Sequence, residues 1–211
     1  MKKALIAAII IIVLSFIIAI YSYSIMPNEM ASHWNAKGEV DGYMSKFWGV
    51  FLMPIISVGI LIIFLIIPYI DPLKKNIQEF RRYFDGLIVL LMMFLLYIYI
   101  LTLLWNSGTK INIGQFMLPA LGILFFYMGV LIQHAKMNWF VGIRTPWTLS
   151  NETVWNKTHK IGAKLFKACG VIAILAMLVP NQSIFIVLVS VLLVTAYVII
   201  YSYVEYKRVK K

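Results

Sequence analysis

Residues 138–162 read NWFVGIRTPWTLSNETVWNKTHKIG, and they are the longest polar interval in the sequence. The interval contains Arg144 and three of the six tryptophans, Trp139, Trp147 and Trp155. The chain on both sides of it is mostly apolar. We therefore expect this interval to lie at a membrane surface, between helices that cross the bilayer.

The composition is that of an integral membrane protein. Of the 211 residues, 62% are hydrophobic and only 13% are charged, and the mean hydropathy is +0.89. Soluble domains have about 25% charged residues. The net charge of +11 is explained by topology, because basic residues collect in cytoplasmic loops, so we expect no direct binding of nucleic acid. The single cysteine, Cys169, excludes a disulfide within the chain.

Apolar segments long enough to cross a bilayer, which takes about 20 residues, recur along the chain. There are six of them, at residues 4–26, 47–70, 84–105, 114–135, 162–179 and 183–204. The first is longer than the apolar core of a signal peptide, so we expect it to be retained. The sequence thus predicts an all-α integral membrane protein built as a bundle of six transmembrane helices.

The basic residues predict how the bundle is oriented. If the N-terminus lies inside, the inner segments carry 16 of the 19 lysines and arginines. The outer segments carry only Lys37, Lys46 and Lys110. Such a bias in short loops is a strong positive-inside signal. We therefore expect a multi-pass protein of a bacterial cell membrane with both termini in the cytoplasm.

The outer loop at residues 27–46 is long enough to fold by itself. Its turn signals are the runs Asn-Ala-Lys-Gly at 35–38 and Asp-Gly at 41–42. We expect a small extracytoplasmic element, a hairpin around Trp34 and Val40. The one histidine and three scattered acidic residues of this loop lack the spacing of a metal site, so we expect no metal and no cofactor.

The inner loop at residues 136–161 divides into two parts. Residues 140–147 contain a glycine and a proline and are expected to be irregular, with Thr145 extended before the proline. Ser150 or Asn151 then caps a helix that carries an acidic residue in its first turn. We expect this helix to continue without a break into the fifth span.

The helix of the inner loop carries lysines spaced three and four residues apart, which places them on one face. They are Lys157, Lys160, Lys164 and Lys167. A basic stripe beside aromatic residues is typical of a helix at an anionic leaflet, so we expect anionic lipids of the inner leaflet as partners. Docking of a cytoplasmic partner is the alternative. For Arg144, two interpretations stay open: pairing with a backbone carbonyl or Glu152, or a role in recognition.

Nothing in the sequence indicates catalysis. The chain lacks HExxH, GxSxG and a phosphate-binding glycine loop, so we expect no enzyme and no catalytic residue. A membrane hydrolase using His134, His159 and Glu152 is a generic hypothesis. The first four spans have no ionisable residue in mid-membrane, which disfavours ion-coupled transport. A small exporter or flippase for a peptide or lipid stays open as an alternative.

Two stretches resemble the SdpI-type family of bacterial membrane immunity proteins. The outer stretch is similar to that family's small domain of unknown function, DUF1648, through His33, Asn35, Gly38, Asp41 and Gly42. The inner stretch is similar to the family's G-I-R-T-P-W-T-L segment and the W-x-x-T-[HN] helix after it, through Gly142, Ile143, Arg144, Thr145, Pro146, Trp147, Thr148, Leu149, Trp155, Thr158 and His159. The resemblance implies a DUF1648-like region at 1–70 and an SdpI-like region at 71–211.

The resemblance also implies a function. Members of the family protect the producing cell against a secreted membrane-active peptide toxin. In the best-known form, the toxin-bound protein also holds a cytoplasmic transcriptional repressor, of the winged-helix kind, at the membrane. We expect toxin contact through the outer residues His33, Trp34, Asn35, Gly38, Asp41 and Gly42. We expect the inner loop to signal or to bind a partner through Gly142, Arg144, Thr145, Pro146, Trp147, Trp155, Thr158 and His159.

Overall fold

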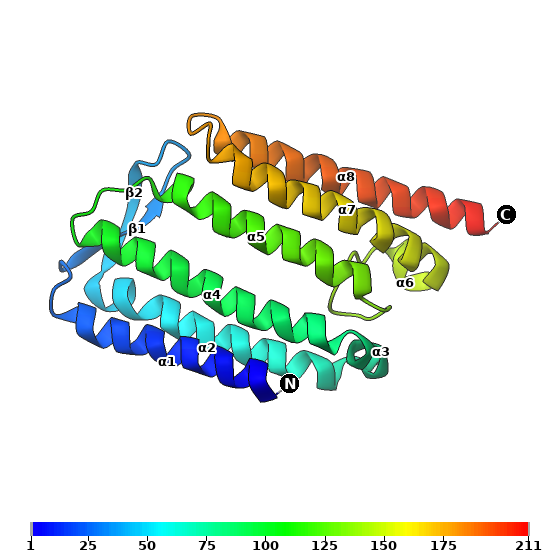
Figure 1. Cartoon of the computed structure of the whole chain (residues 1–211), viewed down its shortest axis with the longest axis horizontal. Coiled ribbons are helices and arrows are strands. Elements are labelled where there is room, and N and C mark those ends of the chain that lie inside the picture. Colours follow the sequence, from blue (N-terminus) through cyan, green and yellow to red (C-terminus); the bar gives the residue numbers. More distant parts are fainter. Residues whose placement is uncertain (1, 211) are drawn as a thin grey trace.

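The computed structural model describes residues 2–210 and is mostly helical. Long helices lie side by side in a bundle (Figure 1): α1 (Lys2–Tyr23), α2 (Lys46–Ile70), α4 (Arg81–Asn106), α5 (Ile113–His134), α7 (Glu152–Ala176) and α8 (Ser183–Val209). At one end, called the hairpin end, lie β1 (Glu29–Trp34) and β2 (Val40–Ser45). At the other, called the motif end, lie the short helices α3 (Lys74–Glu79) and α6 (Pro146–Ser150).

Within residues 2–210, five helices are long and apolar enough to cross a membrane, namely α1, α2, α4, α5 and α8. They coincide with five of the six expected spans, and the protein is therefore an all-α membrane protein that carries a small hairpin. The remaining expected span lies in α7, which carries Glu152 and four lysines and is not among these five helices. Because α7 nonetheless packs lengthwise against α5 and α8 (Figure 1), a sixth span stays a prediction.

The packing of α7 on α5 depends on small residues at the contact. A Cβ added to Gly122 of α5 would lie 2.6 Å from the carbonyl oxygen of Gly170 in α7. A Cβ added to Gly170 would lie at the same distance from the carbonyl oxygen of Gly122. Neither backbone can accept a side chain at this separation. Close approach through glycine is typical of helix pairs in membranes, where apolar burial alone does not drive association.

Three apolar clusters fill the described part of the bundle; one lies between α5, α7 and α8, and the two largest lie toward the ends. The larger one lies toward the motif end and includes Phe80, Phe84 and the indole of Trp155. The smaller one lies beneath the hairpin and includes Tyr99 of α4 and Met30 of β1, both buried. Each end of the bundle therefore has its own core, and each core includes a residue of the polar segment that covers it.

Basic residues gather at the motif end, where α1 begins and α8 ends (Figure 1). They include Lys2, Lys3, Lys74, Lys75, Arg81, Arg82, Lys207, Arg208 and Lys210. Among the described residues, the basic residues at the hairpin end are Lys37, Lys46 and Lys110. This asymmetry is the one that the positive-inside rule requires of a cytoplasmic motif end, and the orientation itself stays a prediction.

Candidate functional site

The outer loop folds into an antiparallel hairpin that connects α1 to α2. The strands pair from Glu29 with Ser45 to Trp34 with Val40, which confirms the hairpin expected around Trp34 and Val40. The register shifts on both sides of His33, as at a β-bulge. A bulge turns a side chain away from the regular alternation of a strand, and His33 is exposed.

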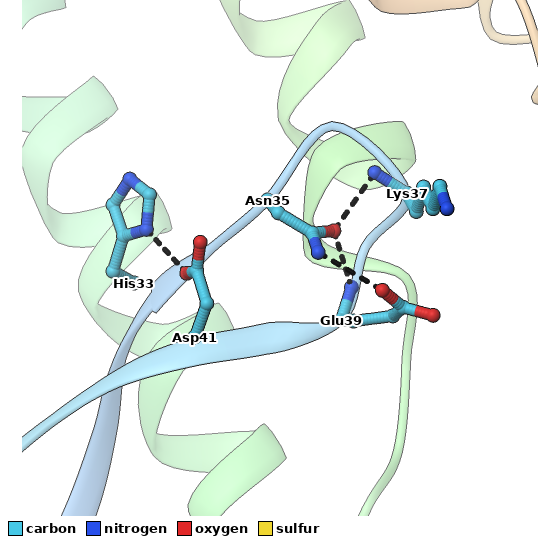
Figure 2. Close-up of polar contacts among 5 residues, drawn as sticks. All are labelled: His33, Asn35, Lys37, Glu39 and Asp41. Atoms are coloured by element: carbon cyan, nitrogen blue, oxygen red, sulfur yellow. Dashed lines mark hydrogen bonds and ion pairs between the residues drawn. The ribbon is translucent and has the colours of Figure 1, made fainter.

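Asn35 holds the tip of the hairpin together (Figure 2). Its side-chain oxygen accepts hydrogen bonds from the backbone N–H groups of Lys37 at 2.9 Å and Glu39 at 3.1 Å. Its side-chain nitrogen donates to the carboxylate of Glu39 at 2.9 Å. Gly38 completes the turn with φ at +81°, a backbone conformation that favours glycine. These two members of the expected outer site therefore shape the turn.

His33 and Asp41 form an exposed pair across the two strands (Figure 2). Nδ1 of His33 lies 2.5 Å from Oδ1 of Asp41, and the side chains are 71% and 45% exposed. Gly42 lies opposite His33 in the ladder. Of the expected outer residues, His33 and Asp41 are the ones that offer polar side-chain atoms at the surface of the strands.

Trp34 attaches the hairpin to the bundle. Its ring packs edge-on against Trp105 of α4 with 5.6 Å between ring centroids. Beside it, Asn106 accepts a hydrogen bond from the N–H of Ala31 at 2.8 Å and donates to the carbonyl of Ala31 at 3.0 Å. Sequence reasoning missed Asn106, because it lies 75 residues from its partner.

The inner loop starts as a tightly bonded turn at the motif end. Asn138 is fully buried, and its side-chain amide makes four hydrogen bonds, of 2.6 to 2.9 Å, to backbone groups within residues 136–141. Asp71, at the end of α2, accepts a bond from the N–H of Trp139 at 2.9 Å. The loop is thus fixed both internally and to α2.

Gly142, Trp155 and His159 form the centre of the motif. Gly142 has φ at +120°, and a Cβ there would lie 2.4 Å from Nε2 of His159. The N–H of Ile143 donates to that same Nε2 at 3.1 Å. The rings of Trp155 and His159 stack with 3.9 Å between centroids, and the indole N–H of Trp155 donates to the carbonyl of Ala135 at 2.8 Å. Two of the residues expected at the inner site, Trp155 and His159, are buried in the fold.

The hydrogen bonds of His159 define its protonation. Nε2 accepts from a backbone N–H, so the proton lies on Nδ1, which donates to the carbonyl of Trp155 at 2.8 Å. Burial lowers the pKa of His159 from 6.5 to about 4. His134 makes different contacts, since it stacks on Tyr83 and bonds to Val130. These contacts give no support to the hydrolase hypothesis, because neither ring nitrogen of His159 is free for proton transfer.

Thr145 and Thr148 begin helix α6. Thr145 is extended, as expected before a proline, with φ −104° and ψ 162°. Its hydroxyl accepts from the N–H of Thr148 at 3.2 Å, and the Thr148 hydroxyl accepts from the N–H of Thr145 at 2.9 Å. This reciprocal capping, with Pro146 in the first turn, starts a helix where the sequence predicted irregular backbone through Trp147. That detail of the prediction was wrong.

The exposed part of the motif is small. Arg144 donates to the carbonyl of Trp139, one of the two kinds of partner expected for it, and Trp139 is itself 50% exposed. Pro146 is exposed beside them. Trp147 is partly buried against Tyr203 of α8, with 5.1 Å between ring centroids. The remaining expected side chains at this end are buried, namely Thr145, Thr158 and His159 together with Trp155.

Asn151 caps α7, accepting from the N–H of Val154 at 3.1 Å, which confirms the expected helix start. The lysines of α7 do not form one uniform stripe. Lys157 bonds at 2.8 Å to Glu205, a residue of α8 that is 3% exposed. Lys167 bonds to Gln133 of α5. These two lysines therefore tie α7 to its neighbours.

Two regions of the chain match known families. Residues 134–202 match the SdpI/YfhL protein family, and residues 10–58 match a domain of unknown function, DUF1648. The chain is 33% identical over 209 residues to the immunity protein SdpI of Bacillus subtilis (strain 168), an alignment that covers 99% of this chain and 98% of that protein. No solved structure matches the chain. The resemblance in the sequence is confirmed, and this multi-pass bacterial membrane protein belongs to the SdpI/YfhL family.

Proposed function

We propose that this chain is an immunity protein that protects its cell against a secreted, membrane-active peptide toxin. The similarity to an immunity protein extends over 99% of the chain, so it includes both the hairpin and the motif. In the proposed orientation the basic motif end faces the cytoplasm and the hairpin faces outward. We include α7 as a sixth span, because an even number of spans brings both termini to the basic side.

The exposed pair of His33 and Asp41 carries the proposal of toxin contact. The hairpin beneath it is held by the turn of Asn35 and by the attachment of Ala31 to Asn106. A surface that is already ordered loses little conformational entropy when a ligand binds. Binding of this kind requires no catalytic group, so an exposed and ordered hairpin is sufficient to capture the toxin and block its action.

The test is survival of a sensitive bacterial strain that lacks its own immunity genes and expresses this chain. The secreted peptide is titrated, and the amount of chain in the membrane is measured in parallel. We expect rescue by the native chain and loss of rescue with His33→Ala or Asp41→Ala. Glu29→Ala, which removes another exposed acid from the same hairpin, is the matched control and should protect normally. Absence of rescue by the native chain at confirmed expression would reject the immunity function.

A second role, holding a transcriptional repressor at the membrane, is favoured by the exposed side chains of Arg144, Trp139 and Pro146. Arginine and tryptophan are over-represented among the side chains that dominate protein–protein binding energy. We expect a tagged winged-helix repressor encoded beside this gene to move to the membrane when toxin is added. Arg144→Ala should release the repressor while protection persists. Unchanged recruitment in this variant would contradict the role of the motif surface.

An exporter or flippase is the alternative function. Moving a peptide or a headgroup requires polar groups along a path between the spans. The buried acids of α4 and α8 lie near helix ends instead, with Asp85 bonded to Arg81, and Glu205 to Lys157 and Arg208. This placement favours binding over transport. Energy-dependent movement of labelled toxin across vesicles that contain the chain would reverse that preference.

A further inference from the structure

A groove of about 570 Å³ runs between α7 and α8 on the outer surface of the bundle. Aliphatic side chains line most of it, namely Ile161, Leu165, Leu193, Val194 and Ile200. Lys164 is the charged residue on its wall. The helices that line it, α7 and α8, lie side by side at one edge of the bundle (Figure 1), and the outer helices of a membrane bundle face lipid.

Lys164 differs from the lysines that join α7 to its neighbours. Lys157 and Lys167 are held by Glu205 and Gln133. Lys160 and Lys164 are exposed, and neither ammonium group has a hydrogen bond or ion pair with any residue in the described range 2–210. The two are one turn apart on the same face of α7, so they form a local pair of uncompensated positive charges.

The lining of the groove is mostly apolar, and Lys164 supplies its charge. Side chains on a helix lean toward its N-terminus, so Lys164 leans toward Lys160 and the motif end. Because α8 runs antiparallel to α7 and Glu205 bonds to Lys157, Leu193 and Val194 lie farther from the motif end than Lys164 does. A ligand that fits this groove therefore has an anionic head and an apolar tail.

We propose that the groove binds an anionic phospholipid, with its headgroup at Lys160 and Lys164 and an acyl chain along Leu193 and Val194. Lysine stems cover apolar surface while their ammonium groups reach the headgroup layer. A negatively charged headgroup is attracted by both lysines, whereas a zwitterionic lipid with the same chains gains only the apolar contact. The site is independent of the toxin, since it requires only that the motif end borders a leaflet.

The experiment is native mass spectrometry of the full chain in detergent with an equimolar mixture of phosphatidylglycerol and phosphatidylcholine. We expect the native chain to retain phosphatidylglycerol preferentially. Lys164→Gln should lower that preference about fivefold, the effect expected for one basic side chain at an anionic surface. Lys75→Gln, which removes an exposed charge from α3 at the same end, is the control. An equal loss in both variants, or none in Lys164→Gln, would overturn the site.

The groove itself is tested separately by filling it. Leu193→Trp places a bulky ring among the lining side chains and should reduce retention of both lipids. Leu192→Trp introduces the same ring at a neighbouring position that is 59% exposed and does not line the groove, and it should behave as the native chain. The thermal stability of each variant is measured, and lipid retention is compared only among variants as stable as the native chain. Normal lipid retention by Leu193→Trp would refute the groove as the binding place.

Discussion

The hairpin and the motif lie at opposite ends of the bundle and use their signature residues differently. In the motif, Asn138, Thr148 and His159 are buried and bond to the surrounding backbone. In the hairpin, His33 and Asp41 face outward and remain largely exposed. The comparison teaches that a residue pattern shared by a family can specify how a segment folds as readily as it specifies what the segment binds.

The largest expected effect is on the motif core. Trp155→Ala removes a fully buried indole and leaves the carbonyl of Ala135 without its donor. We expect the free energy of unfolding to fall by about 3–5 kcal/mol. Chemical denaturation of the purified chain in detergent measures the change. Trp48→Ala, at a tryptophan that is 50% exposed near the hairpin end, is the control and should cost far less. Equal losses of unfolding free energy in the two variants would contradict a structural role for Trp155 in the motif.

Acid is the next test, because it acts on the buried histidine of the motif. His159 lies before the expected span at 162–179, and its pKa is lowered to about 4 in the folded chain from 6.5. Below pH 6.5 the imidazole of His159 is therefore protonated in the unfolded chain, whereas in the folded chain it stays neutral until the pH approaches 4. Stability should be complete above that pH and fall by about 3 kcal/mol as the pH approaches 4.

Denaturation midpoints measured across this pH range check the acid prediction. His159→Gln removes the titrating ring, so its stability should be lower overall and change less between pH 6.5 and 4. The two profiles separate the histidine from the carboxylates, which titrate in both proteins. Parallel profiles for the native chain and the variant would show that the buried imidazole does not control the acid response.

A smaller, local effect is expected at the hairpin tip. Asn35→Ala removes the acceptor for two backbone N–H groups of the turn, which costs about 1 kcal/mol per hydrogen bond. Hydrogen exchange should accelerate within residues 27–46 while the bundle helices are unchanged. Lys37→Ala, at the same turn, should exchange as the native chain does. If Asn35→Ala lowers the free energy of global unfolding as much as Trp155→Ala does, the expectation of a local effect is wrong.

The smallest effect on stability is expected for the exposed pair. Asp41→Asn weakens a contact that solvent screens, so the free energy of unfolding should change by about 0.5 kcal/mol or less. The midpoint of chemical denaturation measures it. A loss of several kcal/mol would make the pair a structural element, and any loss of protection would then no longer indicate toxin contact.

Local patterns predicted much of the fold. Apolar runs located the long helices, the turn signals located the hairpin, and Asn151 located the start of α7. The long-range polar ties were missed, because a residue such as Asp71 bonds to a partner 68 positions away and Asn106 to one 75 positions away. No local pattern marks such residues as partners.

The candidate site was predicted less completely than the fold. The motif residues were identified, but a sequence pattern does not distinguish a buried tryptophan from an exposed one. Trp155 and His159 therefore seemed suited to recognition, whereas packing against Gly142 places both in the interior. Lys157 likewise reads as part of a basic face, and only the fold brings Glu205 to it.

The most direct test of the account compares Asp41→Asn with Thr148→Ala in the toxin survival assay, with survival expressed per amount of chain in the membrane. Thr148 is fully buried and bonded within the motif, so its replacement should lower the amount of chain and the survival in proportion. Asp41→Asn should lower survival several-fold at an unchanged amount. Full protection by Asp41→Asn would contradict the proposal that the hairpin recognises the toxin.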